Sequence, residues 1–118
     1  MPGTVKKLSS PISRPLIVLV PHRLGRQEAR RRLDSGIDRL QRELSVLLGE
    51  LDYYWQGDTL NFTASAMWQR LAGRIEVLDD ALRVEIELPW MMQFLRDAIR
   101  KRVQGRGIAL LEKPPGEA

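Results

Sequence analysis

The chain has 118 residues, of which 43% are hydrophobic, and its 19 basic and 15 acidic residues give a net charge of +4. This length suits one domain with a single core. Cysteine is absent, which excludes disulfides, thiolate metal sites and a cysteine nucleophile. The apolar run at residues 16–20 is too short for a signal-peptide core or a transmembrane segment, so we expect a soluble cytoplasmic protein.

The basic residues are concentrated in two segments. Residues 1–32 contain eight basic residues against Glu28 alone, and residues 96–106 contain five against Asp97 alone. This asymmetry indicates an anionic partner, either nucleic acid or lipid, although basic runs also occur on helices that only face water.

The N-terminal residues 1–14 are rich in Ser, Pro, Gly and Lys and predict a flexible arm, followed by one domain over 15–111 and a disordered tail over 112–118. Residues 16–20 predict a strand that is apolar on both faces. A two-layer monomer would leave Ile17 and Leu19 in water. We therefore predict that a second copy of the chain, or the N-terminal arm, covers them.

A helix is predicted from about residue 26 to 48, because apolar residues recur at spacings of three and four. They are Ala29, Leu33, Ile37, Leu40, Leu44 and Leu47. Gly36 lies beside this stripe at a cost of about 1 kcal/mol relative to Ala. A close approach of another element would explain it, and a kink is the alternative. Gly49 is a natural C-terminal stop.

Two β-hairpins follow, with two-residue turns at Gly57-Asp58 and Asp79-Asp80. Large apolar residues would face one another on one side of the sheet: Trp55 with Leu60, Tyr53 with Phe62, Val77 with Leu82, and Ile75 with Val84. Opposite charges would pair on the other side: Glu76 with Arg83, and Arg74 with Glu85. Since a one-residue slip would break every pair, the alternation predicts four antiparallel strands with one buried face.

A second helix is predicted over residues 90–104, with Pro89 at its start and Gly105 and Gly107 ending it. Residues 108–111 would then add a separate contact. The predicted fold is an α+β two-layer sandwich in the order β-α-β-β-β-β-α, with a mostly antiparallel sheet and both helices on one face. Strands are expected to pair in sequence order, the second lying parallel beside the first.

In that arrangement the two helices run antiparallel and bring their basic ends together. The predicted anion-binding rim consists of Arg23, Arg26, Arg30, Arg31, Arg100, Lys101, Arg102 and Arg106. Arginines at a helix N-terminus oppose the helix dipole, whereas an anion is stabilised there. An anionic partner would therefore explain them, and solubility alone is the competing explanation.

No set of residues in the chain has the spacing of a known catalytic motif. His22 is the single histidine, and between a strand and a helix it is better suited to capping the connection than to a metal site or a triad. Asp79 and Asp80 suit a tight turn, and Gly105-Arg106-Gly107 is too short for a phosphate loop. We expect no catalytic residue, no metal and no cofactor, and hence not an enzyme.

The aromatic and methionine residues leave two interpretations open. Tyr54, Trp68 and Trp90 could be surface aromatics that stack on bases, although packing is the more common role. Met91 and Met92 could form an adaptable apolar contact with a partner, or belong to the core.

Several short motifs, in this order and spacing over residues 16–104, resemble the polyhydroxyalkanoic acid system family. They are residues 21–25 (PHRLG), 28–32 (EARRR), 55–58 (WQGD), 60–62 (LNF), 73–77 (GRIEV) and 84–88 (VEIEL). The resemblance implies an accessory protein of storage polyester metabolism that associates with the granule surface or granule proteins, and implies no catalytic residue. The predicted topology is also similar to small ribosome-associated hibernation factors, which makes RNA binding the alternative function.

Overall fold

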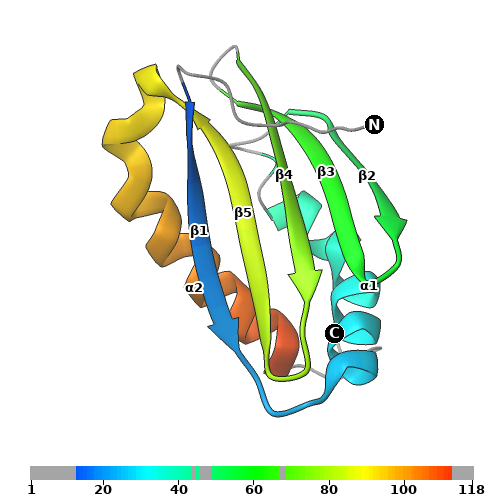
Figure 1. Ribbon diagram of the computed structural model, residues 1–118. Coiled ribbons are helices and arrows are strands. Elements are labelled where there is room, and N and C mark those ends of the chain that lie inside the picture. Colours follow the sequence, from blue (N-terminus) through cyan, green and yellow to red (C-terminus); the bar gives the residue numbers. More distant parts are fainter. Residues whose placement is uncertain (1–12, 44, 46–48, 67–68, 113–118) are drawn as a thin grey trace, which may run out of the picture.

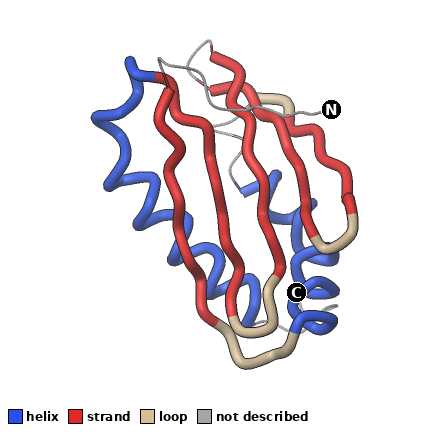
Figure 2. Tube along the Cα trace, in the orientation of Figure 1, coloured by secondary structure: helices blue, strands red, loops and turns tan. Residues whose placement is uncertain are grey.

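The computed structural model describes residues 13–43, 45, 49–66 and 69–112. Its elements, in chain order, are β1 (Ser13–Pro21), α1 (Arg26–Glu43), β2 (Leu51–Gln56), β3 (Thr59–Ala66), β4 (Gln69–Val77), β5 (Ala81–Pro89), the 3-10 helix η1 (Trp90–Leu95) and α2 (Arg96–Glu112). The five strands form one antiparallel sheet, and both α-helices cover the same face of it (Figures 1 and 2). The predicted α+β sandwich and its element order are confirmed.

The strand order is β1-β5-β4-β3-β2, so the expected pairing of the first strand with the second is wrong. β1 instead pairs antiparallel with β5, Val18 lying opposite Val84. β1 and β2 point the same way but form opposite edges of the sheet. After β1, α1 crosses behind the sheet to the far edge, and the three hairpins then lead back to β1 (Figure 1). The apolar sequence of β1 specifies a buried strand but not its neighbour.

Both predicted hairpin registers are confirmed. Trp55 lies opposite Leu60 and Val77 opposite Leu82, as the two-residue turns require. Gly57 has φ +60°, the left-handed conformation that such a turn needs. Between these two hairpins, β3 and β4 pair from Thr59 with Glu76 as far as Ala66 with Gln69.

The core lies between the sheet and the two helices. It is made of Leu16, Val18 and Val20 from β1, Ala29, Leu33 and Ile37 from α1, and apolar residues of β3, β4, β5 and α2. A smaller cluster forms where Met92 of η1 packs on Leu71 and Leu88 of the sheet. Gly36 is where α1 meets α2, since a Cβ there would lie 2.8 Å from Leu110 Cδ1. This confirms the close approach, and α1 continues unbroken through Gly36.

The predicted end of the second helix is wrong. α2 runs through Gly105 and Gly107 to Glu112, and its last turn buries Leu110 and Leu111 in the core, which offsets the poor helix propensity of the two glycines. Gly107 also lies against Val20, where a Cβ would be 3.1 Å from its Cγ2. The first part of the predicted helix is also different, since residues 90–95 form the 3-10 helix η1 rather than the first turns of an α-helix.

Three further details concern the predicted boundaries. β1 begins at Ser13, so two residues assigned to the arm belong to the sheet. α1 is described to Glu43, and the predicted stripe residues Leu44 and Leu47 lie outside the described residues. Trp68 also lies outside them.

Candidate functional site

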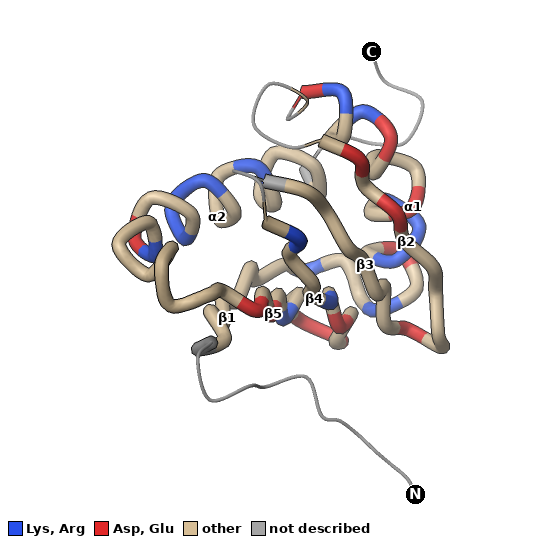
Figure 3. Tube along the Cα trace, turned by 90° about the horizontal axis from the view of Figure 1, so that it is seen from above, with Lys and Arg blue, Asp and Glu red and all other residues tan. Residues whose placement is uncertain are grey.

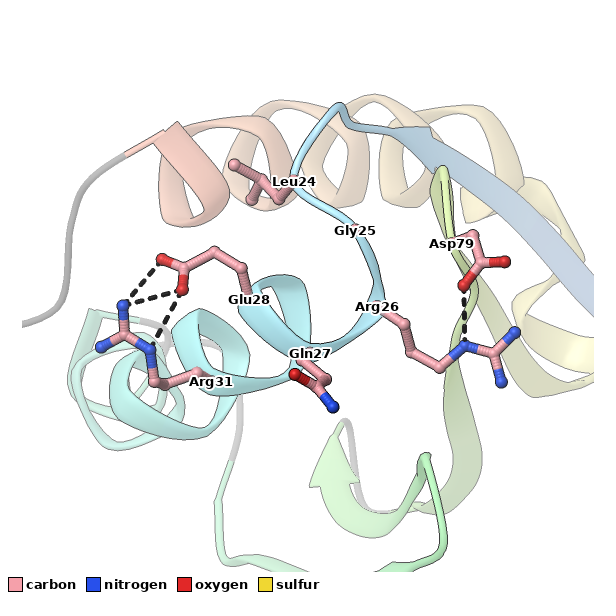
Figure 4. Close-up of a pocket in the computed structure, with 7 residues that line it drawn as sticks. All are labelled: Leu24, Gly25, Arg26, Gln27, Glu28, Arg31 and Asp79. Carbon is pink, nitrogen blue, oxygen red and sulfur yellow. Dashed lines mark hydrogen bonds and ion pairs between the residues drawn. The ribbon is translucent and has the colours of Figure 1, made fainter.

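An open hollow lies at the N-terminus of α1 and is drawn in Figure 4. Arg26 Nε donates to Asp79 Oδ1 at 3.1 Å, and Arg31 Nη2 donates to Glu28 Oε1 at 2.8 Å. The two guanidinium groups point to opposite sides of the helix start, each towards a carboxylate. Hydrogen bonds from Arg32 and then Arg31 hold the pKa of Glu28 below its ordinary value. The charges of the hollow therefore balance one another.

Arg30 is placed by the first hairpin. Its Nε lies 3.5 Å from Asp58 Oδ1, and its guanidinium carbon lies 4.0 Å from the centre of the Trp55 ring, a cation–π geometry. Trp55 Nε1 donates to Asp34 at 2.9 Å, which ties β2 to α1. Next to it, burial raises the pKa of the Tyr53 hydroxyl, and the charges of Asp38 and Asp34 raise it further.

The structure does not gather the predicted rim into one surface. Arg106 donates to Glu43 at 3.0 Å, at the opposite end of α1 from Arg26 and Arg31. Arg100 donates to the carbonyl of Ile17 at 2.8 Å, beside β1. The remaining members, Arg23, Lys101 and Arg102, are exposed. The helices do run antiparallel, as expected, but they cross along their length, so the basic residues of α2 extend away from the start of α1 (Figure 3).

His22 caps the connection between β1 and α1, as predicted. Its Nδ1 accepts a hydrogen bond from the Leu24 N–H at 3.1 Å, which leaves the proton on Nε2 to be donated to the Leu78 carbonyl at 3.2 Å. Its own N–H donates to the Asp80 carbonyl. Both ring nitrogens are thus occupied in joining this connection to the β4–β5 turn.

Among the described residues, no group of three or more His, Cys, Asp or Glu side chains is placed to hold a metal ion. No helix in the described ranges has the length and apolar character needed to cross a membrane.

The outer face of the sheet carries charged side chains on β4 and β5 and apolar ones on β1. Glu85 accepts from both Arg74 and Arg83, at 3.2 and 3.0 Å, which confirms one of the predicted charge pairs. Ile17 and Leu19 stand on this face with 38% and 54% of their surface exposed. The expectation that β1 has a second apolar face in need of cover is therefore consistent with the geometry.

An apolar cluster on η1 is the other notable surface. Trp90, Met91 and Phe94 are 63%, 43% and 75% exposed, and we call them the η1 cluster. Because a 3-10 helix repeats every three residues, Met91 and Phe94 share its outer side, while Met92 and Leu95 share the inner side that packs on Leu88. Five of the six residues of η1 are apolar, more than a single inner side can bury. This run of apolar residues is the feature of the sequence that could have indicated an exposed apolar surface here.

The sequence left open whether Met91 and Met92 were core or contact residues. The structure divides them, since Met92 is buried and Met91 is exposed. Tyr54 and Trp90 are surface aromatics, each 63% exposed, and they belong to opposite edges of the domain. They do not form one stacking platform.

The fold defines a small α+β protein with one antiparallel sheet and two helices on one of its faces. The chain belongs to the family described as "Putative polyhydroxyalkanoic acid system protein", whose sequence model matches residues 17–106. The resemblance in the motifs is thereby confirmed. A search of curated proteins and a search of solved structures found no match.

Proposed function

We propose that this protein is a non-enzymatic accessory protein of the polyhydroxyalkanoate system that works in the cytoplasm at the surface of the storage polyester granule. Membership of the family gives the metabolic context. The observation that carries the proposal is the η1 cluster, because exposed Trp, Met and Phe side chains gathered on one short helix of a folded domain mark a contact with an apolar partner.

The polar side chains support a binding role over a chemical one. The ring nitrogens of His22 are both held by backbone groups. At the hollow beside α1, the carboxylates of Glu28 and Asp79 are held by arginines. His22 and Asp79 join structural elements, and Glu28 binds two arginines of its own helix. A catalytic base must instead have an acceptor atom available to the proton of the substrate.

RNA binding is the alternative function, and we favour it less. A phosphate backbone needs a row of cations that it can neutralise. Arg26, Arg30 and Arg106 face carboxylates of their own chain. This pairing removes the start of α1 and Arg106 as sites for a phosphate backbone. The exposed Lys101 and Arg102 of α2 stay available to an anionic partner, and they adjoin the apolar η1 cluster rather than a longer basic row.

The test is sedimentation of the purified full chain with isolated polyester granules, alongside imaging of a tagged chain in cells that contain granules. We expect the wild-type chain to sediment with granules and Trp90→Ser/Phe94→Ser to remain in the supernatant. Tyr54→Ser is the matched control, since Tyr54 is as exposed as Trp90 but lies at the other edge of the sheet. A diffuse wild-type chain that stays in the supernatant would refute the proposal.

A further inference from the structure

Among the described residues, several basic side chains without a carboxylate partner lie beside the η1 cluster. Arg96 donates to the Gln93 amide oxygen and the Pro15 carbonyl, and Arg100 donates to the Ile17 carbonyl. These partners are neutral, so they satisfy hydrogen bonds without cancelling charge. By contrast, the arginines at the start of α1 lie against carboxylates.

The composition of this region shows the same bias. From Trp90 to Leu111 the chain has five basic residues and Asp97 as its single acidic residue. Among the side chains that the structure describes, Arg106 has a carboxylate partner, Glu43, and the other four basic residues have none. Figure 3 shows basic positions along α2, whereas acidic and basic positions alternate around α1.

The apolar and basic groups lie on two consecutive elements, η1 and α2. α2 begins directly after η1, and Lys101 lies in its second turn. Lys101 and Arg102 are both exposed. η1 itself projects at the corner where β5 ends, away from α1 (Figure 1).

Exposed Trp and Phe next to Lys and Arg form the pattern of an interfacial anchor, in which aromatic side chains enter the acyl boundary and cations meet anionic headgroups. We propose that η1 and the first half of α2 bind an anionic phospholipid layer, with the η1 cluster inserted and Lys101 and Arg102 on the headgroups. This rests on the proposed function in that it names lipid, rather than bare polyester, as what the η1 cluster contacts.

The experiment is flotation of the purified full chain with vesicles of phosphatidylcholine alone, or with one third phosphatidylglycerol, at low salt. We expect binding to the anionic vesicles that weakens as salt rises, because salt screens the headgroup charge. Trp90→Ser/Phe94→Ser should bind at least about tenfold more weakly, and Lys101→Glu about fivefold more weakly. The controls Tyr54→Ser and Arg23→Glu, which match these changes in aromatic loss and in charge, should bind within about twofold of wild type.

Binding to native granules, compared with binding to granules whose lipid has been stripped by detergent, separates this inference from the proposed function. Binding to anionic vesicles and to native but not stripped granules supports both. Binding to both kinds of granule without vesicle binding overturns the lipid anchor and leaves the granule function standing. Binding to vesicles alone supports the anchor and refutes the granule function. Two results overturn the lipid anchor. One is equal vesicle binding by the wild type and Trp90→Ser/Phe94→Ser. The other is a wild-type chain that dimerises through the η1 cluster and does not bind vesicles.

Discussion

Gly36 of α1 lies directly against Leu110 of α2. A Cβ built on Gly36 would be 2.8 Å from Leu110 Cδ1 and 2.9 Å from its Cγ, distances that require one of the helices or the leucine to move. The two helices thus meet through a position that has no side chain, and the close contact brings the buried end of α2 onto α1.

We predict that Gly36→Ala lowers the free energy of unfolding by about 1 kcal/mol, the balance of two opposing effects. The substitution gains about 1 kcal/mol of helix propensity. Overpacking against Leu110 costs about 1 to 3 kcal/mol, and this term should dominate because the leucine is itself buried. Urea unfolding followed by circular dichroism measures the difference.

A double-mutant cycle gives the control. In a Leu110→Ala background, itself destabilised by roughly 2 to 5 kcal/mol, the added methyl group has room and Gly36→Ala should be neutral or stabilising. Equal costs in both backgrounds would contradict the contact between Gly36 and Leu110.

We predict that Gly105→Ala stabilises the protein by about 1 kcal/mol, since α2 continues through this residue and glycine is the poorer helix former. Nothing lies within 4 Å of a Cβ at this position, so the gain is not offset by a clash. Gly107→Ala is the matched control on the same helix. Its Cβ would be 3.1 Å from Val20 Cγ2, and it should therefore gain less or lose stability. The opposite ranking in thermal unfolding would show that the helix ends near Gly105.

The sheet could be predicted closely from the sequence because strand alternation and two-residue turns are local constraints. Tyr53, Trp55, Leu60 and Phe62 form one face, and no other register would place them there. The pairing of β1 could not be predicted in the same way. It depends on the path of α1 behind the sheet, and Leu16, Val18 and Val20 would be equally well buried beside β2 or β5.

The end of α2 and the basic rim could not be predicted for a related reason. Gly105 and Gly107 have the local signature of a helix end, but burial of Leu110 and Leu111 outweighs it. The prediction of the basic rim rested on the assumption that basic residues near a helix end have no acidic partner. Arg30 instead reaches Asp58 in a hairpin turn, a contact between segments 28 residues apart in the chain. Side-chain partners of this kind depend on tertiary structure.

We predict that the ion pairs of Glu28 contribute free energy of unfolding that is lost at acidic pH. The pKa of Glu28 in the folded chain lies below its ordinary value of 4.5, so its contribution is complete above pH 4.5 and is lost as pH falls through the lowered pKa. Glu28→Gln should therefore destabilise the protein near neutral pH and have a smaller effect near pH 3 or so. Urea midpoints across this range measure the effect. Asp52→Asn, at an exposed position of β2, serves as the control, and a cost of Glu28→Gln that does not change with pH would contradict the prediction.

The edge of β1 is closed to strand addition. Pro15 and Pro21 have no N–H to donate, and the carbonyls of Pro15 and Ile17 already accept hydrogen bonds from Arg96 and Arg100. A second copy could therefore not extend the sheet readily at β1. The exposed side chains of Ile17 and Leu19 lie on the outer face instead, which makes a face-to-face contact the geometry available to them.

We predict that the chain self-associates through this face at micromolar concentration. Sizing by light scattering should give a mass that rises with concentration for the wild-type chain, whereas Ile17→Lys/Leu19→Lys should remain monomeric. The double variant should keep its fold, because lysines at these positions point to water in the monomer, across from Glu85 and Arg83. Asn61→Lys, on the same face but two strands further from β1 than Glu85, should associate like the wild type. A wild-type chain that is monomeric throughout, with a stability that the double variant leaves unchanged, would show that these residues need no cover.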